Sequence, residues 1–91
     1  MDNEIWRDEV HVQGRNLVVL TESLGKDDEG IDCFSTEVCE LKGLEETLVY
    51  LVAHTKREMA IVEHTRVLAD VKVNPNQYTP QAYEDSFGGL D

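Results

Sequence analysis

The side chains of this chain that could do metal chemistry are three histidines, two cysteines and a run of acids between two glycines. In the segment GKDDEGIDCFSTE, Gly30 could serve as the glycine at the sixth position of an EF-hand calcium loop. That alignment places Gly25 first and Thr36 twelfth in the loop, where calcium requires carboxylate ligands. The acidic segment is therefore interpreted as a turn and not as a calcium site.

The histidines and cysteines do not have the spacing of a zinc site. His11, His54 and His64 form no H-x-x-x-H or H-E-x-x-H pair, and the sequence has no C-x-x-C pair. A site built from Cys33, Cys39, His54 and His64 would depend on long-range geometry that spacing does not predict. We expect no bound metal and no cofactor.

Motifs for nucleophilic or phosphate chemistry are also missing from the sequence. No serine or cysteine lies in a glycine elbow, and neither G-x-x-x-x-G-K-[ST] nor G-x-G-x-x-G occurs. We expect that this protein is not an enzyme, so its function has to come from its surface and its charge.

The charge of the chain is strongly acidic. Eight Lys and Arg residues stand against nineteen Asp and Glu residues, for a formal net charge of −11. Residues 1–45 hold twelve acids and four bases, whereas residues 46–91 hold seven acids and four bases, so most of the excess lies in the first half. Such a field repels nucleic acid and anionic lipid and favours a basic protein partner.

The elements that must position these side chains begin with a sheet. The segment EVHVQGRNLVVLTESLG alternates around Val10 and Val12, breaks at QGRN and continues as an apolar run, which predicts a β-hairpin. After the acidic turn, IDCFSTEVCEL is rich in β-branched, aromatic and Cys residues and predicts a third strand. The first 42 residues therefore predict a three-stranded antiparallel meander.

A long helix is expected after Gly43. Residues 44–71 place apolar side chains on one helical stripe, and this stripe would pack on the sheet to give an α+β fold. Two alternatives stay open for the second half of this stretch. Either the helix continues to about residue 69, or it breaks near TKRE and Met59 to Val73 forms a second helix or a strand, with residues 67–73 suited to a fourth edge strand.

The domain is expected to span residues 1–74, followed by an extended or flexible C-terminal tail of residues 75–91 that contains both prolines. The aromatic side chains of this tail favour an arm lying across the domain, with a linear docking motif as the alternative; they are Tyr78, Tyr83 and Phe87.

A cytoplasmic location is expected, because no basic segment followed by an apolar one opens the chain and no apolar run could span a membrane. Cys33 and Cys39 should then be reduced, and on a regular strand they would lie about 20 Å apart.

The leading functional hypothesis is a small acidic binding or inhibitor protein that engages a basic surface of a partner, such as the nucleic-acid groove of a nucleic-acid-binding protein or nuclease. It would mimic nucleic-acid charge, the physical plan of small phage-type inhibitors and nuclease immunity proteins, which is an analogy only. The acids expected to face the partner are Asp27, Asp28, Glu29, Asp32, Glu37 and Glu40.

The alternative hypothesis is a homo-oligomeric structural or assembly protein. The predicted helix has apolar side chains on more of its circumference than one small core needs, so a second copy could cover the surplus. The side chains assigned to this dimer seam are Tyr50, Ile61, Leu68 and Val49.

Overall fold

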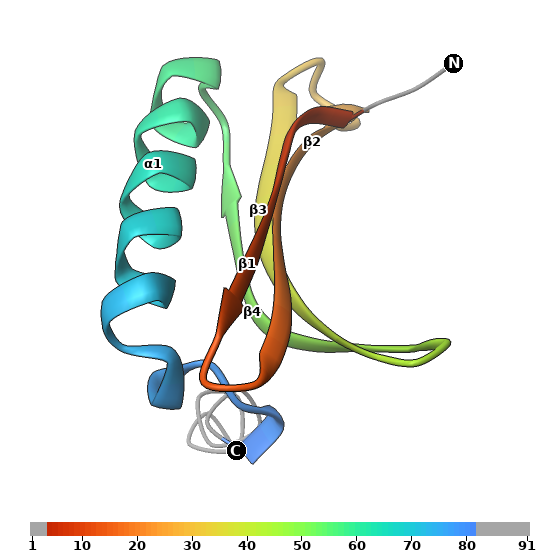
Figure 1. Cartoon of the computed structure of the whole chain (residues 1–91). Coiled ribbons are helices and arrows are strands. Elements are labelled where there is room, and N and C mark those ends of the chain that lie inside the picture. The colour runs from red at the N-terminus through yellow and green to blue at the C-terminus, as the bar shows by residue number, and fades with distance from the viewer. Residues whose placement is uncertain (1–3, 82–91) are drawn as a thin grey trace.

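The computed structural model describes residues 4–81, which form a four-stranded antiparallel sheet with one α-helix on one of its faces (Figure 1). The predicted α+β fold, a meander packed on a helix, is confirmed. The strands pair in chain order, and the elements are β1 (Glu4–Val12), β2 (Arg15–Lys26), β3 (Asp32–Lys42), β4 (Glu45–His54), α1 (Arg57–Val73) and the short 3₁₀-helix η1 (Pro75–Gln77).

The turns between strands follow from their sequences. Gln13 and Gly14 join β1 to β2, and both have positive φ, 51° and 75°. A type I′ hairpin turn requires this at both central residues, and it matches the twist of the flanking strands. Gly43 and Leu44 join β3 to β4, so the chain reverses in two residues at the point where a helix was expected to begin.

The prediction of a helix from residue 44 is wrong, because residues 45–54 form β4 and α1 begins only at Arg57. The chain does change structure near TKRE, but the strand precedes that break and the helix follows it. Val49, Tyr50 and Val52 are β-branched or aromatic, and pairing with β3 gives the backbone groups of Tyr50 and Val52 partners that a helix would otherwise supply.

The prediction of a fourth strand near residues 67–73 is also wrong, since these residues form the last turns of α1. The buried residues of α1 are spaced by four, three and four positions, which is the period of one helical face: Ala60, His64, Val67 and Val71. The apolar residues alone do not make up this stripe, because one of its members is a histidine.

The hydrophobic core lies between α1 and the facing side chains of the sheet. It consists of Val10, Leu17, Val19, Val38, Val49, Val67, Val71 and Tyr78. Tyr78 is only 4% exposed, so the packed part of the chain continues past residue 74 and includes the beginning of the predicted tail. Tyr83 and Phe87 lie outside the described residues.

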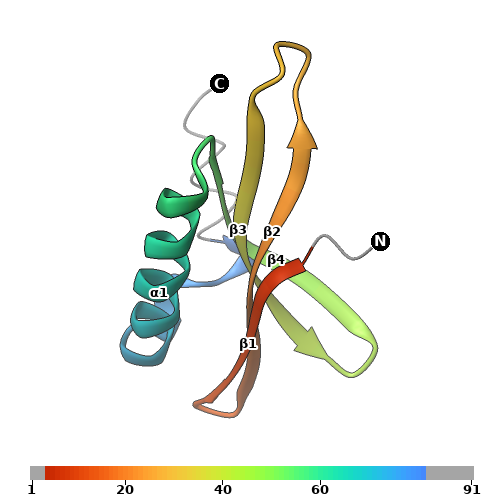
Figure 2. The ribbon, with the colours of Figure 1, turned by 90° about the horizontal axis from the view of Figure 1, so that it is seen from above.

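The sheet has a second face, turned away from α1. Leu17 and Val19 pack in the core and Thr21 bonds to α1, so the alternate residues of β2 point to the opposite side. Among residues 4–81, no helix or strand covers that side, which we call the open face (Figure 2). The β3–β4 turn bends away from α1 in both views (Figures 1 and 2).

Cys33 and Cys39 both lie on β3, six residues apart, and both are free thiols. Within the described part of the chain, no helix is long and apolar enough to cross a membrane.

Candidate functional site

The six acids that the sequence assigned to a partner surface do not form one cluster. Asp27, Asp28 and Glu29 lie exposed in the turn between β2 and β3. Asp27 Oδ1 accepts the backbone N–H groups of Glu29 and Ile31, both at 2.9 Å, so this carboxylate also holds the turn. Asp32 is paired with Lys26 at 2.9 Å.

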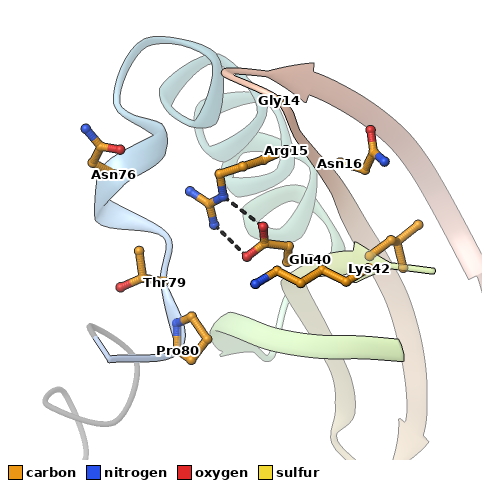
Figure 3. Close-up of a pocket in the computed structure, with 9 residues that line it drawn as sticks. Gly14, Arg15, Asn16, Glu40, Lys42, Asn76, Thr79 and Pro80 are labelled. Carbon is orange, nitrogen blue, oxygen red and sulfur yellow. Dashed lines mark hydrogen bonds and ion pairs between the residues drawn. The ribbon is translucent and has the colours of Figure 1, made fainter. Parts of the chain in front are cut away.

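Glu40 lies on the side of the sheet that faces α1 and is 6% exposed. Arg15 donates from Nε to Oε2 and from Nη2 to Oε1 of this carboxylate, both at 3.0 Å (Figure 3). The Arg15 guanidinium holds the pKa of Glu40 below its ordinary value. Glu40 is therefore committed to an internal ion pair and does not present its charge to a partner.

Arg15 also fixes the chain after α1. Its Nη1 donates to the Pro75 carbonyl at 2.8 Å and its Nη2 to the Tyr78 carbonyl at 2.5 Å. A pocket of about 490 Å³ lies beside this ion pair, with Lys42 and Thr79 among its lining residues (Figure 3). The Arg15 donors are already used by the protein, so the pair acts as an anchor for the segment that carries Tyr78.

Glu37 is the predicted acid that lies at the centre of the open face. Its cross-strand neighbours are Leu20 on β2 and Leu51 on β4. Burial raises the pKa of Glu37, and the nearby carboxylates of Glu22 and Glu46 raise it further. Carboxylates from the two adjacent strands, β2 and β4, thus act on Glu37 across this face.

The open face is apolar between these carboxylates. Val18, Cys39 and Leu48 form one cross-strand row, next to the row that contains Glu37. Val18 and Cys39 are buried, at 3% and 6% exposed, whereas Leu51 is 40% exposed. We call the half-buried to exposed side chains of this face the apolar strip, namely Leu20, Leu48 and Leu51. Burial, followed by the charge of Glu37, raises the pKa of the Cys39 thiol to about 12, so this cysteine stays protonated and is a poor nucleophile.

The apolar side chains assigned to a helical seam are divided between two elements. Val49 and Tyr50 lie on β4, where Val49 is 2% exposed in the core and Tyr50 donates its hydroxyl to Glu63 at 2.8 Å. Both pack against α1 of their own chain. Ile61 and Leu68 do lie on α1, but they face a cleft beside β1.

This α1–β1 cleft has a volume of about 260 Å³ and is lined by Trp6, Asp8, Ile61, His64, Thr65 and Leu68. His64 closes its floor, 5% exposed. Its Nε2 lies 2.8 Å from Asp8 Oδ2 and its Nδ1 lies 2.8 Å from Thr21 Oγ1, which in turn lies 2.9 Å from Thr36 Oγ1. The sequence alone suggests His64 only as a zinc ligand, and the signal for its actual position is the buried stripe of α1.

The order carboxylate, imidazole, hydroxyl is that of a hydrolytic triad, but the geometry does not permit that chemistry. Thr21 is fully buried, so a substrate cannot reach its hydroxyl. Both ring nitrogens of His64 are also bonded, which leaves neither one for a ligand or a proton transfer. The chain of bonds instead ties α1 to β1, β2 and β3.

Among residues 4–81, no group of three or more His, Cys, Asp or Glu side chains is arranged to hold a metal ion. No protein-family model, no curated protein and no solved structure matches this chain.

Proposed function

We propose that this protein is a small non-enzymatic binding or inhibitor protein whose open face engages a basic surface of a partner protein. The observation that carries this proposal is the pairing of a partly exposed apolar strip with the Glu37 carboxylate, which Glu22 and Glu46 repel, on a face that no described helix or strand covers. The apolar strip supplies contact area and the carboxylates select the charge of the partner.

Burial and, after it, two neighbouring carboxylates raise the pKa of Glu37, and the second of these causes favours a basic partner on this face. Glu22 and Glu46 repel the Glu37 carboxylate in the free protein. Arg7, a cation on the same face, lies 3.7 Å from Glu9 and is already engaged there. A Lys or Arg side chain from a partner would offset this repulsion. Charge complementarity would then add to the binding free energy that comes from burying apolar surface.

The partner class with such a surface includes nucleic-acid-binding proteins and nucleases, whose grooves are basic in order to hold phosphates. Binding there would compete with nucleic acid by charge mimicry. Association should be fast and sensitive to salt, because long-range attraction between opposite charges is screened within about 8 Å at physiological ionic strength.

One specific observation favours the homo-oligomeric alternative. Met59 and Val62 are 55% and 62% exposed near the start of α1. Together with Ile61 they leave apolar surface on the helix, and a second copy would cover it. Light-scattering mass of Val62→Glu against the unchanged protein tests this alternative, since a seam through α1 predicts a lower mass for the variant.

The test of the proposed function uses a labelled peptide of alternating Lys and Leu residues as the basic, partly apolar probe. Glu37→Gln and Asp28→Asn each remove one negative charge, the first from the open face and the second from the β2–β3 turn. We expect Glu37→Gln to weaken binding about five-fold, the equivalent of roughly 1 kcal/mol, and Asp28→Asn to change it less than two-fold.

Equal effects of the two substitutions would show that the probe responds only to net charge. A stronger effect of Asp28→Asn would move the binding surface to the acidic turn. Binding that is unchanged between low and high salt would contradict the charge argument altogether.

A further inference from the structure

We infer that the α1–β1 cleft is a second binding site, which takes one basic side chain from an extended segment of a partner protein that pairs with the outer edge of β1. The cleft lies on the side of the sheet opposite the open face, so this inference does not depend on the proposed function.

The edge of β1 provides the backbone half of the site. β1 pairs with β2 and stands first in the sheet, so within the described residues its other edge has no strand beside it. Alternate backbone N–H and C=O groups on such an edge are available to a strand from another chain. An extended peptide that adds there places every second side chain on the α1 side, toward the cleft.

The size of the cleft selects a side chain over a small molecule. Small-molecule sites commonly measure about 300–1,000 Å³. The cleft measures about 260 Å³, which is below that range but sufficient for one long side chain. Ile61 and Leu68, seven residues apart on α1 and so on the same side of the helix, form its apolar wall, and Trp6 on β1 stands across from them.

Charge selects a basic side chain. The Asp8 side chain is 48% exposed, and its Oδ2 is the atom that bonds to His64. An incoming ammonium or guanidinium group could therefore approach the solvent side of the carboxylate. The aliphatic part of a Lys or Arg side chain would lie along Ile61 and Leu68, in the way that long basic side chains cover apolar surface while their charge stays near water.

Arg57 shows that this region accepts a guanidinium. Its Cζ lies 5.7 Å from the centroid of the Trp6 ring. This places a cation at the Trp6 end of the cleft, so the basic side chain of the partner should enter nearer to Asp8 and Leu68. His64, held between Asp8 and Thr21, keeps the carboxylate in position.

The test uses a nine-residue peptide of alternating Thr and Val with Arg at its centre, together with the same peptide carrying Gln or Glu at that position. Trp6 is the single tryptophan of the chain, so its fluorescence and its indole N–H signal report on the cleft. We expect the Arg peptide to shift the Trp6 signal and the β1 amide signals, with the Gln peptide about five-fold weaker and the Glu peptide weaker still.

The matched variants are Asp8→Asn and Glu9→Gln, which remove one charge from adjacent residues on opposite faces of β1. Asp8→Asn should reduce the preference for Arg over Gln to near unity, whereas Glu9→Gln should leave it intact. If Asp8→Asn does not fold, Ile61→Ser against Val62→Ser supplies the same comparison on α1, with loss of binding expected only for Ile61→Ser.

Absence of any shift at millimolar peptide would overturn the inference, as would equal binding of the Arg and Glu peptides. Shifts confined to the open face, and abolished by Glu37→Gln, would assign the peptide to the surface of the proposed function instead. Failure of Glu37→Gln to weaken the Lys-Leu probe leaves this site unaffected, so the two proposals fail separately.

Discussion

Arg15 illustrates how one side chain can decide where a segment packs. Its guanidinium donates to the Glu40 carboxylate and to two backbone carbonyls beyond α1. We predict that Arg15→Met lowers the free energy of unfolding by about 3 kcal/mol, because it leaves a buried carboxylate without its partner. Denaturant unfolding followed by circular dichroism measures the change. The double variant Arg15→Met with Glu40→Gln should recover part of the loss, and an unchanged midpoint for Arg15→Met would contradict the anchor.

The same pair should make stability depend on pH. The folded-state pKa of Glu40 is lowered, so its stabilisation is fully present above the ordinary value of 4.5 and is lost as pH falls through the lower folded-state value. We predict that Glu40→Gln is less stable than the wild-type protein at pH 7 and that the difference narrows below pH 4.5. Thermal unfolding of both proteins across this pH range measures the difference. A difference that widens as pH falls would contradict a lowered folded-state pKa for Glu40.

At the scale of single elements, the first three strands could be predicted from the sequence because glycine turns and alternation act locally. β4 could not, because Leu48, Leu51 and Val52 lie on one helical stripe and also suit a strand. Its partner strand decided between the two, and that pairing is not local. The candidate sites have the same origin: Glu37 meets Glu22 and Glu46 only through strand register, and Asp8 meets His64 across 56 residues of chain.

The start of α1 offers a direct test of helix capping. Lys56 occupies the N-cap position with extended backbone and makes no side-chain cap bond. We predict that Lys56→Asp raises the free energy of unfolding by about 1 kcal/mol, because its carboxylate can accept a free backbone N–H of the first turn and interacts well with the helix dipole. Lys72→Asp, at the opposite end of α1, is the matched control and should destabilise. Equal effects of the two substitutions would mean that net charge, and not capping, governs the result.

At the scale of the whole molecule, one helix cannot cover both faces of a four-stranded sheet. The chain buries one face under α1 and leaves the other with apolar residues among carboxylates. In a symmetric pair of copies joined through their open faces, the carboxylates of Glu22, Glu37 and Glu46 would be brought close to one another. Repulsion between them should therefore keep the apolar strip free for a basic partner at neutral pH.

Neutralising these carboxylates should therefore change the assembly state of the protein. The triple variant Glu22→Gln, Glu37→Gln and Glu46→Gln keeps the shape of the open face but removes its negative charge. We expect light scattering at pH 7 and low salt to give the mass of one 10.3 kDa chain for the wild-type protein and about twice that mass, or more, for the triple variant.

The control removes an equal number of charges from the β2–β3 turn, with Asp27→Asn, Asp28→Asn and Glu29→Gln, and should stay monomeric. If both variants associate equally, net charge alone keeps the copies apart; if neither does, the apolar strip is too small to drive association and the carboxylates have no role in keeping it free.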